Sequence, residues 1–327
     1  MMGGNCMKFK KAAVIASSLL LMLNLLTPVF AFSYESSYTI DVPYDFPVRP
    51  GDPEWFDFDN NDDMVAACQI PEEVLYDMTT DALLLTFLDY PLGSDIFMHS
   101  SLREGIFKVS EYFNGLQELL SREDLPDAIE KVLVSVEETP STINTYSDDY
   151  FEALQDTQII QALNMYFADV DMVSPMYITD TVETPKGSEV EVALNLTWED
   201  VGAASPFYRE WYINDQESKY PKARYLSSNP PSPTYNCHSY AWYSTSSSNN
   251  ANMANPSLYV TDGSYVRDAT AHIGDRVMYG STNAPSHSAI VVSTDILVRS
   301  KWSWTGVYEH APNYGPWKDS TSFWKLA

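Results

Sequence analysis

Cysteine is scarce in this sequence, with only Cys6, Cys68 and Cys237 among 327 residues. Domains that depend on a disulfide framework carry many more cysteines, so that class is excluded. Neither a CxxC pair nor an HExxH helix is present, and we therefore expect no metal site and no cofactor. Cys68 has a helical, apolar setting typical of a small buried side chain. A bridge between Cys68 and Cys237 remains an alternative to two free thiols.

Basic residues are also scarce. The chain has 19 Lys and Arg against 45 Asp and Glu, a formal net charge of −26. Such a charge repels nucleic acid and anionic membranes, which excludes proteins whose partner is either of these. It also disfavours tight docking onto anionic wall polymers unless divalent cations intervene.

Long hydrophobic runs are absent except near the N-terminus. Lys8, Lys10 and Lys11 precede AAVIASSLLLMLNLL, and PVFA then ends in small residues, which is the pattern of a secretory signal peptide. The run is short for a membrane span, and no later stretch resembles one. We expect residues 1–31 to be removed, leaving 19 − 3 = 16 basic and 45 acidic residues, a net charge of −29. The mature chain would then be secreted, extracellular or cell-wall associated, without contact to a membrane.

Residues 63–170 show the apolar spacing of amphipathic helices. Apolar side chains recur three and four residues apart in TTDALLLTFLDYP, FKVSEYFNGLQELL, LPDAIEKVLVSVEETP and SDDYFEALQDTQIIQALNMYF. QIPEEVLYDM, where Pro71 fits the first position of a helix, adds a fifth segment. Five helices with short connections predict an all-helical domain. Before it, residues 32–62 are rich in proline, aspartate and aromatic side chains and have no helical period. They predict an extended acidic and aromatic arm.

The composition changes after residue 170. Residues 171–234 are polar and end in the breaker SSNPPSPT, so we interpret them as a connector. From residue 235 onward, DRVMYG, SAIVVS and ILVRSKW predict strands of an antiparallel sheet. Four of the five histidines lie between positions 238 and 310. The predicted fold is therefore α+β, a helical domain followed by a small α+β domain over residues 235–327, where we expect the chemistry.

Cys237 stands where a nucleophile can be activated. In TYNCHSYAWYS, Asn236 can cap a helix that Cys237 opens. Free N–H groups and the dipole at a helix start lower the pKa of a thiol and can bind an oxyanion. A base is also needed, and PSHSAIVVS places His287 at the start of an apolar strand. The alternatives are an inert buried thiol and a plain loop histidine.

These motifs resemble the NlpC/P60 and CHAP group of papain-like cysteine amidases. The resemblance covers residues 235–325 and rests on NCHSYAW, GDRVMY, HSAIVV and ILVRSKW, in that order. It implies a papain-like domain that cleaves amide bonds, mostly in peptidoglycan stem peptides, with Cys237 as nucleophile and His287 as base. The third polar residue of the group lies on the strand after the histidine, which implies Ser300, with His310 as an alternative. The chain departs from the group in having Asn-Cys-His around its cysteine.

Three further residues could line the oxyanion or substrate site. Some members of the group place a tyrosine about a dozen residues before the cysteine, and Tyr225 stands at that distance. Asn236 neighbours the cysteine. Trp302 belongs to an aromatic-rich stretch whose rings could stack on sugars or peptide planes, or could equally form a core. His238 is interpreted as a surface or packing histidine and His272 as a structural one.

The leading interpretation is a secreted cysteine-dependent amide hydrolase whose partner is a cell-wall peptide or a protein substrate. One alternative is a secreted cysteine protease or toxin that acts on proteins. Another is a non-enzymatic binding or surface protein with an inactive pair. The stretch ACQIPEEVLYDMTTDALLLTFLDYPLGSDIF resembles a module of exported proteins of Gram-positive bacteria, and YNCHSYAWY with DGSYV resembles a secreted family of the same bacteria. Neither resemblance implies an oligomeric state.

Overall fold

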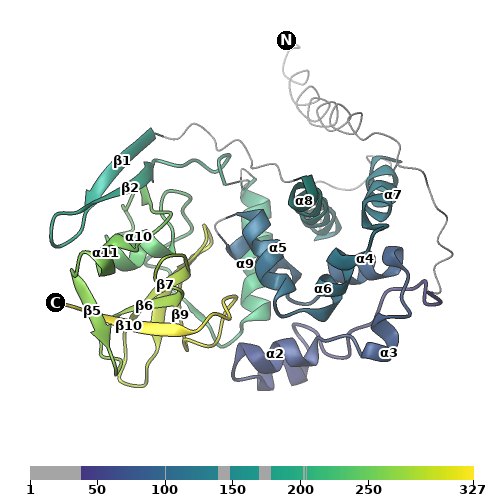
Figure 1. The fold of residues 1–327 in the computed structure, drawn as a ribbon, viewed down its shortest axis with the longest axis horizontal. Coiled ribbons are helices and arrows are strands. Elements are labelled where there is room, and N and C mark those ends of the chain that lie inside the picture. Colours follow the sequence, from purple (N-terminus) through teal and green to yellow (C-terminus); the bar gives the residue numbers. More distant parts are fainter. Residues whose placement is uncertain (1–37, 100, 139–147, 169–177, 202, 204) are drawn as a thin grey trace, which may run out of the picture. The chain divides into compact units, whose positions relative to one another are not determined.

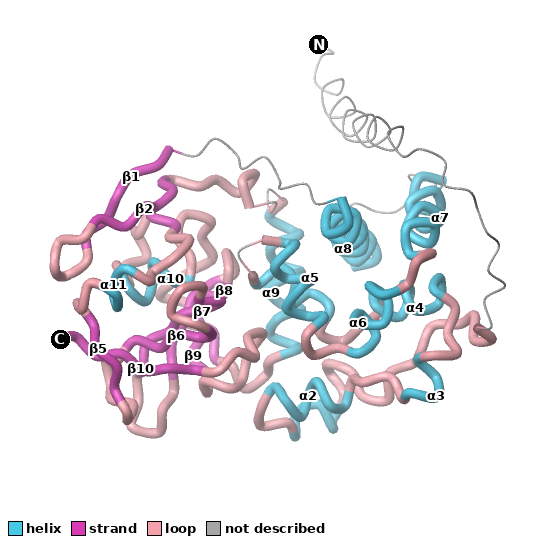
Figure 2. The backbone as a smooth tube through the Cα atoms, viewed as in Figure 1, coloured by secondary structure: helices cyan, strands magenta, loops and turns pink. Residues whose placement is uncertain are grey.

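The helices and strands of this protein are segregated along the chain (Figures 1 and 2). The computed structural model describes residues 38–327 except 100, 139–147, 169–177, 202 and 204. The first described half, up to about residue 164, is helical, and antiparallel sheets with some helices follow it. The predicted α+β class is therefore confirmed. The expected signal peptide and the first residues of the arm lie outside the described residues.

The helical region begins within the stretch 38–62. Its elements are η1 (Pro53–Asp57), α2 (Asn61–Ala67), α3 (Glu72–Leu75), α4 (Thr80–Leu88), η2 (Gly93–Met98), α5 (Leu102–Ser110), α6 (Asn114–Ser121), α7 (Leu125–Glu138) and α8 (Asp148–Ala168). Side chains of Asn60, Thr79 and Ser101 accept backbone N–H groups at the starts of α2, α4 and α5. Such caps satisfy donors that the helix itself leaves open. Within the described part, no helix combines the length and apolar composition of a membrane span.

Two antiparallel sheets follow. The smaller one has the order β1 (Ile178–Glu183), β2 (Glu189–Leu194), β4 (Ala251–Asn252). The larger one has seven strands in the order β3 (Arg224–Tyr225), β9 (Gly306–His310), β8 (Val298–Trp302), β7 (Pro285–Val291), β6 (Arg276–Gly280), β10 (Thr321–Leu326), β5 (Tyr265–Asp268). Helices α9 (Pro206–Lys219), α10 (Cys237–Trp242) and α11 (Leu258–Thr261) complete the chain. The expected strands DRVMYG, SAIVVS and ILVRSKW are β6, β7 and β8. The stretch expected as a connector carries β1, β2, α9 and β3.

The seven-stranded sheet is covered on both faces. Side chains alternate between the faces along each strand, and cross-strand partners share a face. One face joins the apolar core of the helical region through Val277, Tyr279, Ala289, Val291, Val298, Trp302 and Tyr308. The opposite face joins a second core with residues of α10 and α11 through Met278, Ile290 and Val307. Every residue of β7 is consequently buried.

Helix α9 connects the helical region to the sheet. Tyr212 of α9 lies 6.0 Å from the Phe97 ring of η2 and 5.1 Å from the Trp304 ring beyond β8, between centroids. Lys219 pairs with Asp215 at 2.9 Å and also reaches the Ser94 hydroxyl. These charges are nearly buried, so the pairing offsets a desolvation cost that either would otherwise impose.

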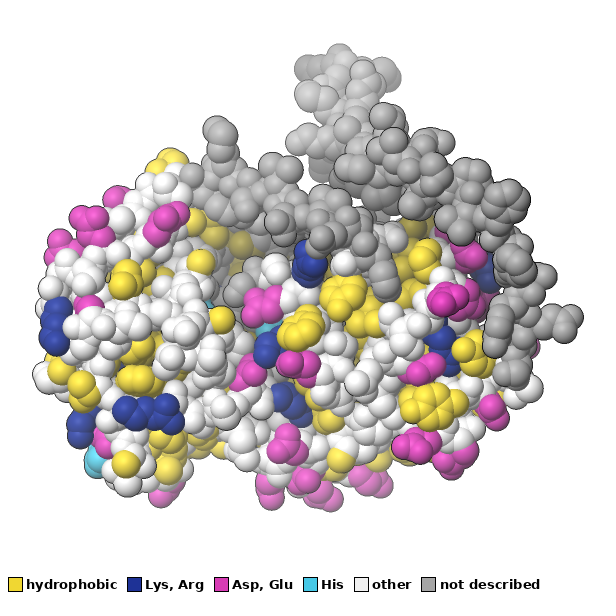
Figure 3. All heavy atoms as spheres, viewed as in Figure 1, with side chains coloured by type: hydrophobic (Ala, Val, Ile, Leu, Met, Phe, Trp, Pro, Cys, Tyr) yellow, Lys and Arg dark blue, Asp and Glu magenta, His cyan; other side chains and the backbone are white. Residues whose placement is uncertain are grey.

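Acidic side chains are spread over the face of the molecule drawn in Figure 3. Several ion pairs of the described residues have an exposed partner, and both side chains are exposed in the pair of Lys131 with Asp81 at 2.7 Å. Exposed pairs of this kind contribute roughly 0–1 kcal/mol each. The cores, rather than the surface charges, therefore hold the described fold together.

Candidate functional site

Cys237 is the first residue of α10, as the sequence predicts. The side chain of Asn236 caps this helix by accepting the N–H of Ser239 at 3.0 Å. The Asn236 amide also donates to the carbonyl of Met253 at 2.7 Å. Asn236 is thus held by its own helix and by the chain beside β4, which fixes the backbone at Cys237.

Cys237 is a free cysteine of intermediate burial, and Cys68 is a free, buried cysteine. No disulfide joins them, so the alternative of a bridge is wrong for this structure. Burial raises the pKa of the Cys237 thiol to about 12. The backbone N–H groups of Ser288 and His238 face the sulfur and act in the opposite direction, while the Glu104 carboxylate raises the pKa further. The thiol is therefore protonated at neutral pH in this conformation.

The sulfur of Cys237 lies where β7 and β8 separate. These two strands pair only at Ile290 with Arg299 and at Val291 with Val298. The N–H of Val291 donates to the carbonyl oxygen of Asp275, on the β6 side of the strand. Along an antiparallel strand, successive N–H groups point to opposite sides. The N–H of Ser288 therefore points toward β8, where no strand partner receives it and the sulfur of Cys237 does.

His287 precedes Ser288 on β7, but its ring points to the other face of the sheet. It stacks on Trp317 with 3.3 Å between ring centroids and meets Tyr279 edge-on at 5.1 Å. The side chain is fully buried, and neither ring nitrogen has a hydrogen-bond partner among the described residues. Burial lowers the pKa of His287 well below its ordinary value, and His310, His238 and His99 lower it further. The imidazole is thus neutral and makes no hydrogen bond to Cys237.

The side chain of Ser288 lies on the face of the sheet that is covered by α10 and contacts two residues of that helix. Its hydroxyl lies 2.8 Å from Nδ1 of His238 and accepts the indole N–H of Trp242 at 2.8 Å. Burial lowers the pKa of His238 to about 4. His238 therefore packs in the core beneath α10, as the sequence interpretation has it. The sequence analysis missed Ser288, because its role depends on a helix 50 residues away.

Ser300, His310 and Trp302 form a group of their own. The Ser300 hydroxyl lies 2.8 Å from Nε2 of His310 and accepts the Trp302 indole N–H at 3.0 Å. Nδ1 of His310 lies 2.8 Å from the carbonyl oxygen of Ala311. The structure therefore brings these three predicted residues together, although none of them hydrogen-bonds to His287.

Tyr225 lies apart from Cys237. It belongs to the edge strand β3 and packs on Tyr308, with 5.5 Å between ring centroids, and against Gly306. Strands β9 and β8 stand between it and the sulfur. At about 4.8 Å per strand, that separation places Tyr225 beyond direct reach of a group on Cys237.

Lys301 is a buried cation that the sequence analysis did not select. Its ammonium donates to the carbonyls of Ser232 at 3.1 Å and Ser303 at 2.8 Å and lies 5.0 Å from the Tyr235 ring centroid. Burial lowers its pKa to about 7, while the nearby Cys237 raises it. The sequence feature that could have selected Lys301 is a lysine within the predicted strand ILVRSKW.

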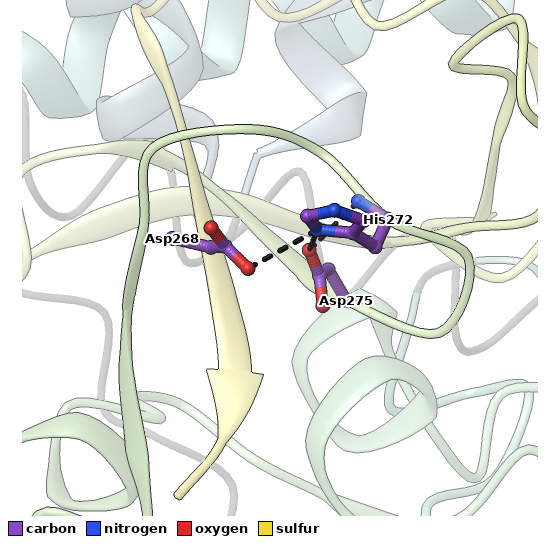
Figure 4. A group of neighbouring side chains, drawn as sticks. All are labelled: Asp268, His272 and Asp275. Carbon is purple, nitrogen blue, oxygen red and sulfur yellow. Dashed lines mark hydrogen bonds and ion pairs between the residues drawn. The ribbon is translucent and has the colours of Figure 1, made fainter.

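One group of side chains within the described ranges has the spacing of metal ligands: Asp268, His272 and Asp275 (Figure 4). Nδ1 of His272 lies 3.2 Å from the Asp268 carboxylate and 3.7 Å from that of Asp275. The N–H of His272 donates to Asp275, and Lys325 lies 3.3 Å from Asp268. The carboxylates are thus occupied by contacts that close the loop between β5 and β6. A metal ion would have to displace Lys325 from Asp268.

Comparisons with known proteins supply no relative. No family model, no curated protein and no solved structure matches this chain. The assignment of function therefore depends on the site.

Proposed function

We propose that this protein is a secreted cysteine-dependent amide hydrolase with Cys237 as nucleophile and His287 as base. One observation carries the proposal. The free, partly buried Cys237 lies at the gap between β7 and β8 and is faced by the N–H groups of Ser288 and His238, while His287, the chain neighbour of Ser288, has no hydrogen-bond partner among the described residues. N–H groups aimed at a reacting centre are the means by which enzymes stabilise a thiolate or an oxyanion.

The mechanism follows from these positions. The N–H of Ser288 that faces the sulfur is one peptide group from the Cα of His287, so the proposed mechanism requires the imidazole to rotate away from Trp317 toward the β7–β8 gap. The sulfur then attacks the amide carbonyl carbon, and its proton passes to the imidazole. The imidazole gives that proton to the leaving amine as the C–N bond breaks, which leaves a thioester on Cys237. Water, deprotonated by the same imidazole, then attacks the thioester carbon; the C–S bond breaks, the acid is released, and the imidazole returns the proton to the sulfur of Cys237.

The order of elements supports a papain-like domain. A helix opened by the cysteine precedes three antiparallel strands, β6, β7 and β8, with the histidine at the start of the middle one. The resemblance to NlpC/P60 and CHAP amidases has this same order. On that resemblance and on the signal peptide, the substrate is a peptide bond of cell-wall peptidoglycan.

A non-enzymatic surface protein is the second candidate, and specific observations favour it. The pKa of the thiol is about 12, no hydrogen bond joins it to His287, and Ser300 and His310 bind each other rather than His287. A pair arranged in this way is inactive unless the site rearranges.

The test uses the secreted chain with two substrates, peptidoglycan fragments and an unfolded protein. We expect wild type to cleave the fragments, and Cys237→Ser and His287→Gln each to lower the rate by about a hundredfold or more. Cys68→Ser is the matched control and should retain activity, because that thiol lies in the core of the helical region. Cleavage of the unfolded protein alone would indicate a protease. Equal rates for wild type and Cys237→Ser would exclude cysteine catalysis.

A further inference from the structure

Two groups of the helical region act electrostatically on the proposed catalytic pair. His99, which follows η2, lies close enough to His287 to lower its pKa, and Glu104 of α5 raises the pKa of Cys237. The ring of His287 is fully buried against Trp317 on the face of the sheet that packs on the helical region. A peptide substrate has no path to this imidazole in the observed conformation.

A chain of polar contacts holds α5 to the sheet at this point. Nζ of Lys108 lies 2.9 Å from one carboxylate oxygen of Asp319, and the hydroxyl of Ser286 donates to the other at 2.5 Å. Ser286 is the residue before His287. Lys108 also pairs with Glu111 at 3.1 Å, within its own helical region. We call Lys108, Asp319 and Ser286 the α5 clamp.

The clamp can open without disrupting the apolar core. Helix α5 packs against η2, α6 and α8, which belong to the helical region itself. Lys108 and Asp319 are about one-fifth exposed, and with His99 they line a hollow of about 210 Å³. The apolar attachment between the helical region and the sheet lies elsewhere, in the shared core that includes Val277, Tyr279 and Trp302 and along α9 through Tyr212 and its ring neighbours.

We propose that the α5 clamp is an autoinhibitory contact that keeps the Cys237–His287 site closed, and that its transient opening limits the rate at which wild type hydrolyses substrate. This inference rests on the proposed hydrolase function. It assigns the helical region a regulatory role, and it accounts for a thiol whose pKa is raised where catalysis requires a thiolate.

The experiment measures alkylation of Cys237 by iodoacetamide under native conditions, with each site read by mass spectrometry. The clamp variants are Lys108→Met and Asp319→Asn. Lys131→Met is the matched control, because it breaks an exposed ion pair on α7. Cys68 is an internal control, since it is fully buried and reacts only when the chain unfolds.

We expect Cys237 to react about tenfold faster in both clamp variants, because a half-buried ion pair then no longer favours the closed state. The reversed pair, Lys108→Asp with Asp319→Lys, rebuilds the ion pair but not the contact with Ser286, so it should return the rate part of the way to that of wild type. Lys131→Met should match wild type. If Lys108→Met unfolds, Cys68 will be labelled as well, and the result for Asp319→Asn then decides between an open and a closed site. Labelling of Cys237 at the wild-type rate in folded clamp variants would overturn the clamp.

Hydrolysis assays on the same variants separate the two proposals. Faster hydrolysis together with faster labelling supports both. If wild type and the clamp variants hydrolyse substrate at the same rate and are labelled at the same rate, the clamp is refuted and the proposed hydrolase function stands. If folded clamp variants are labelled quickly but cleave no substrate, the proposed hydrolase function is refuted. The α5 clamp would then limit access to the thiol without regulating an enzyme.

Discussion

The hydroxyl of Ser288 should be one of the most important single groups for stability in the sheet region. It serves both the indole of Trp242 and the imidazole of His238, each at 2.8 Å. The two side chains are 3% and 1% exposed, and Nε2 of His238 has no partner of its own. Ser288→Ala therefore removes the only side-chain partner that the described structure gives to either ring.

The magnitude follows from the two groups left behind. A buried polar atom without a partner costs about 1–3 kcal/mol, and the variant creates two. Loss of the burial cost of the hydroxyl itself reduces the sum, so we expect a decrease of about 2–4 kcal/mol in the free energy of unfolding. For a unit of nearly 300 residues, each kcal/mol lowers Tm by roughly 2 °C, which gives roughly 4–8 °C.

Urea denaturation at neutral pH, followed by tryptophan fluorescence, measures this loss. The control is Ser247→Ala, an exposed serine in the loop after α10. It should shift the free energy of unfolding by less than about 0.5 kcal/mol. A Ser288→Ala variant no less stable than this control would refute the reasoning, since the two rings would then find other partners or water.

Three further predictions concern acid, packing and the thiol. Burial lowers the pKa of His99, His238 and His310 from 6.5 to about 4, so the unfolded chain binds protons first as the pH falls. Their contribution to stability should be complete above about pH 6.5 and lost toward pH 4, and urea midpoints that stay constant over this range would contradict it. A Cβ on Gly105 would lie 2.0 Å from a carbonyl oxygen of η2, so Gly105→Ala should cost about 2 kcal/mol despite its better helix propensity, and an unchanged Tm would show otherwise. Because the pKa of Cys237 is about 12, its native alkylation rate should still rise above pH 9, whereas a plateau below that pH would reveal a thiolate.

The elements of this fold could be predicted where their signal is local. Periodic apolar residues predicted the helical region, and short β-type runs predicted β6, β7 and β8. The cap formed by Asn236 at the start of α10 could also be predicted, because a helix cap depends only on the capping residue and the three residues after it. GSEVEVALNLTW alternates like a strand and contains β2, but its sheet partners and α9 were not anticipated. SSNPPSPT and the polar composition of 171–234 indicated a connector, while the partners of β2 and α9 lie elsewhere in the chain.

The site depended on information that no local pattern holds. The sequence by itself determined that Cys237 opens a helix and that His287 begins a strand. Only the tertiary structure decided that the His287 ring faces Trp317, that Ser288 faces α10 and that Lys108 reaches Asp319. Side chains of β7 are buried on both faces, so its polarity pattern cannot reveal which face meets which core. That choice was made by packing between segments far apart in the chain, where the free energy of burying each face outweighs any local preference.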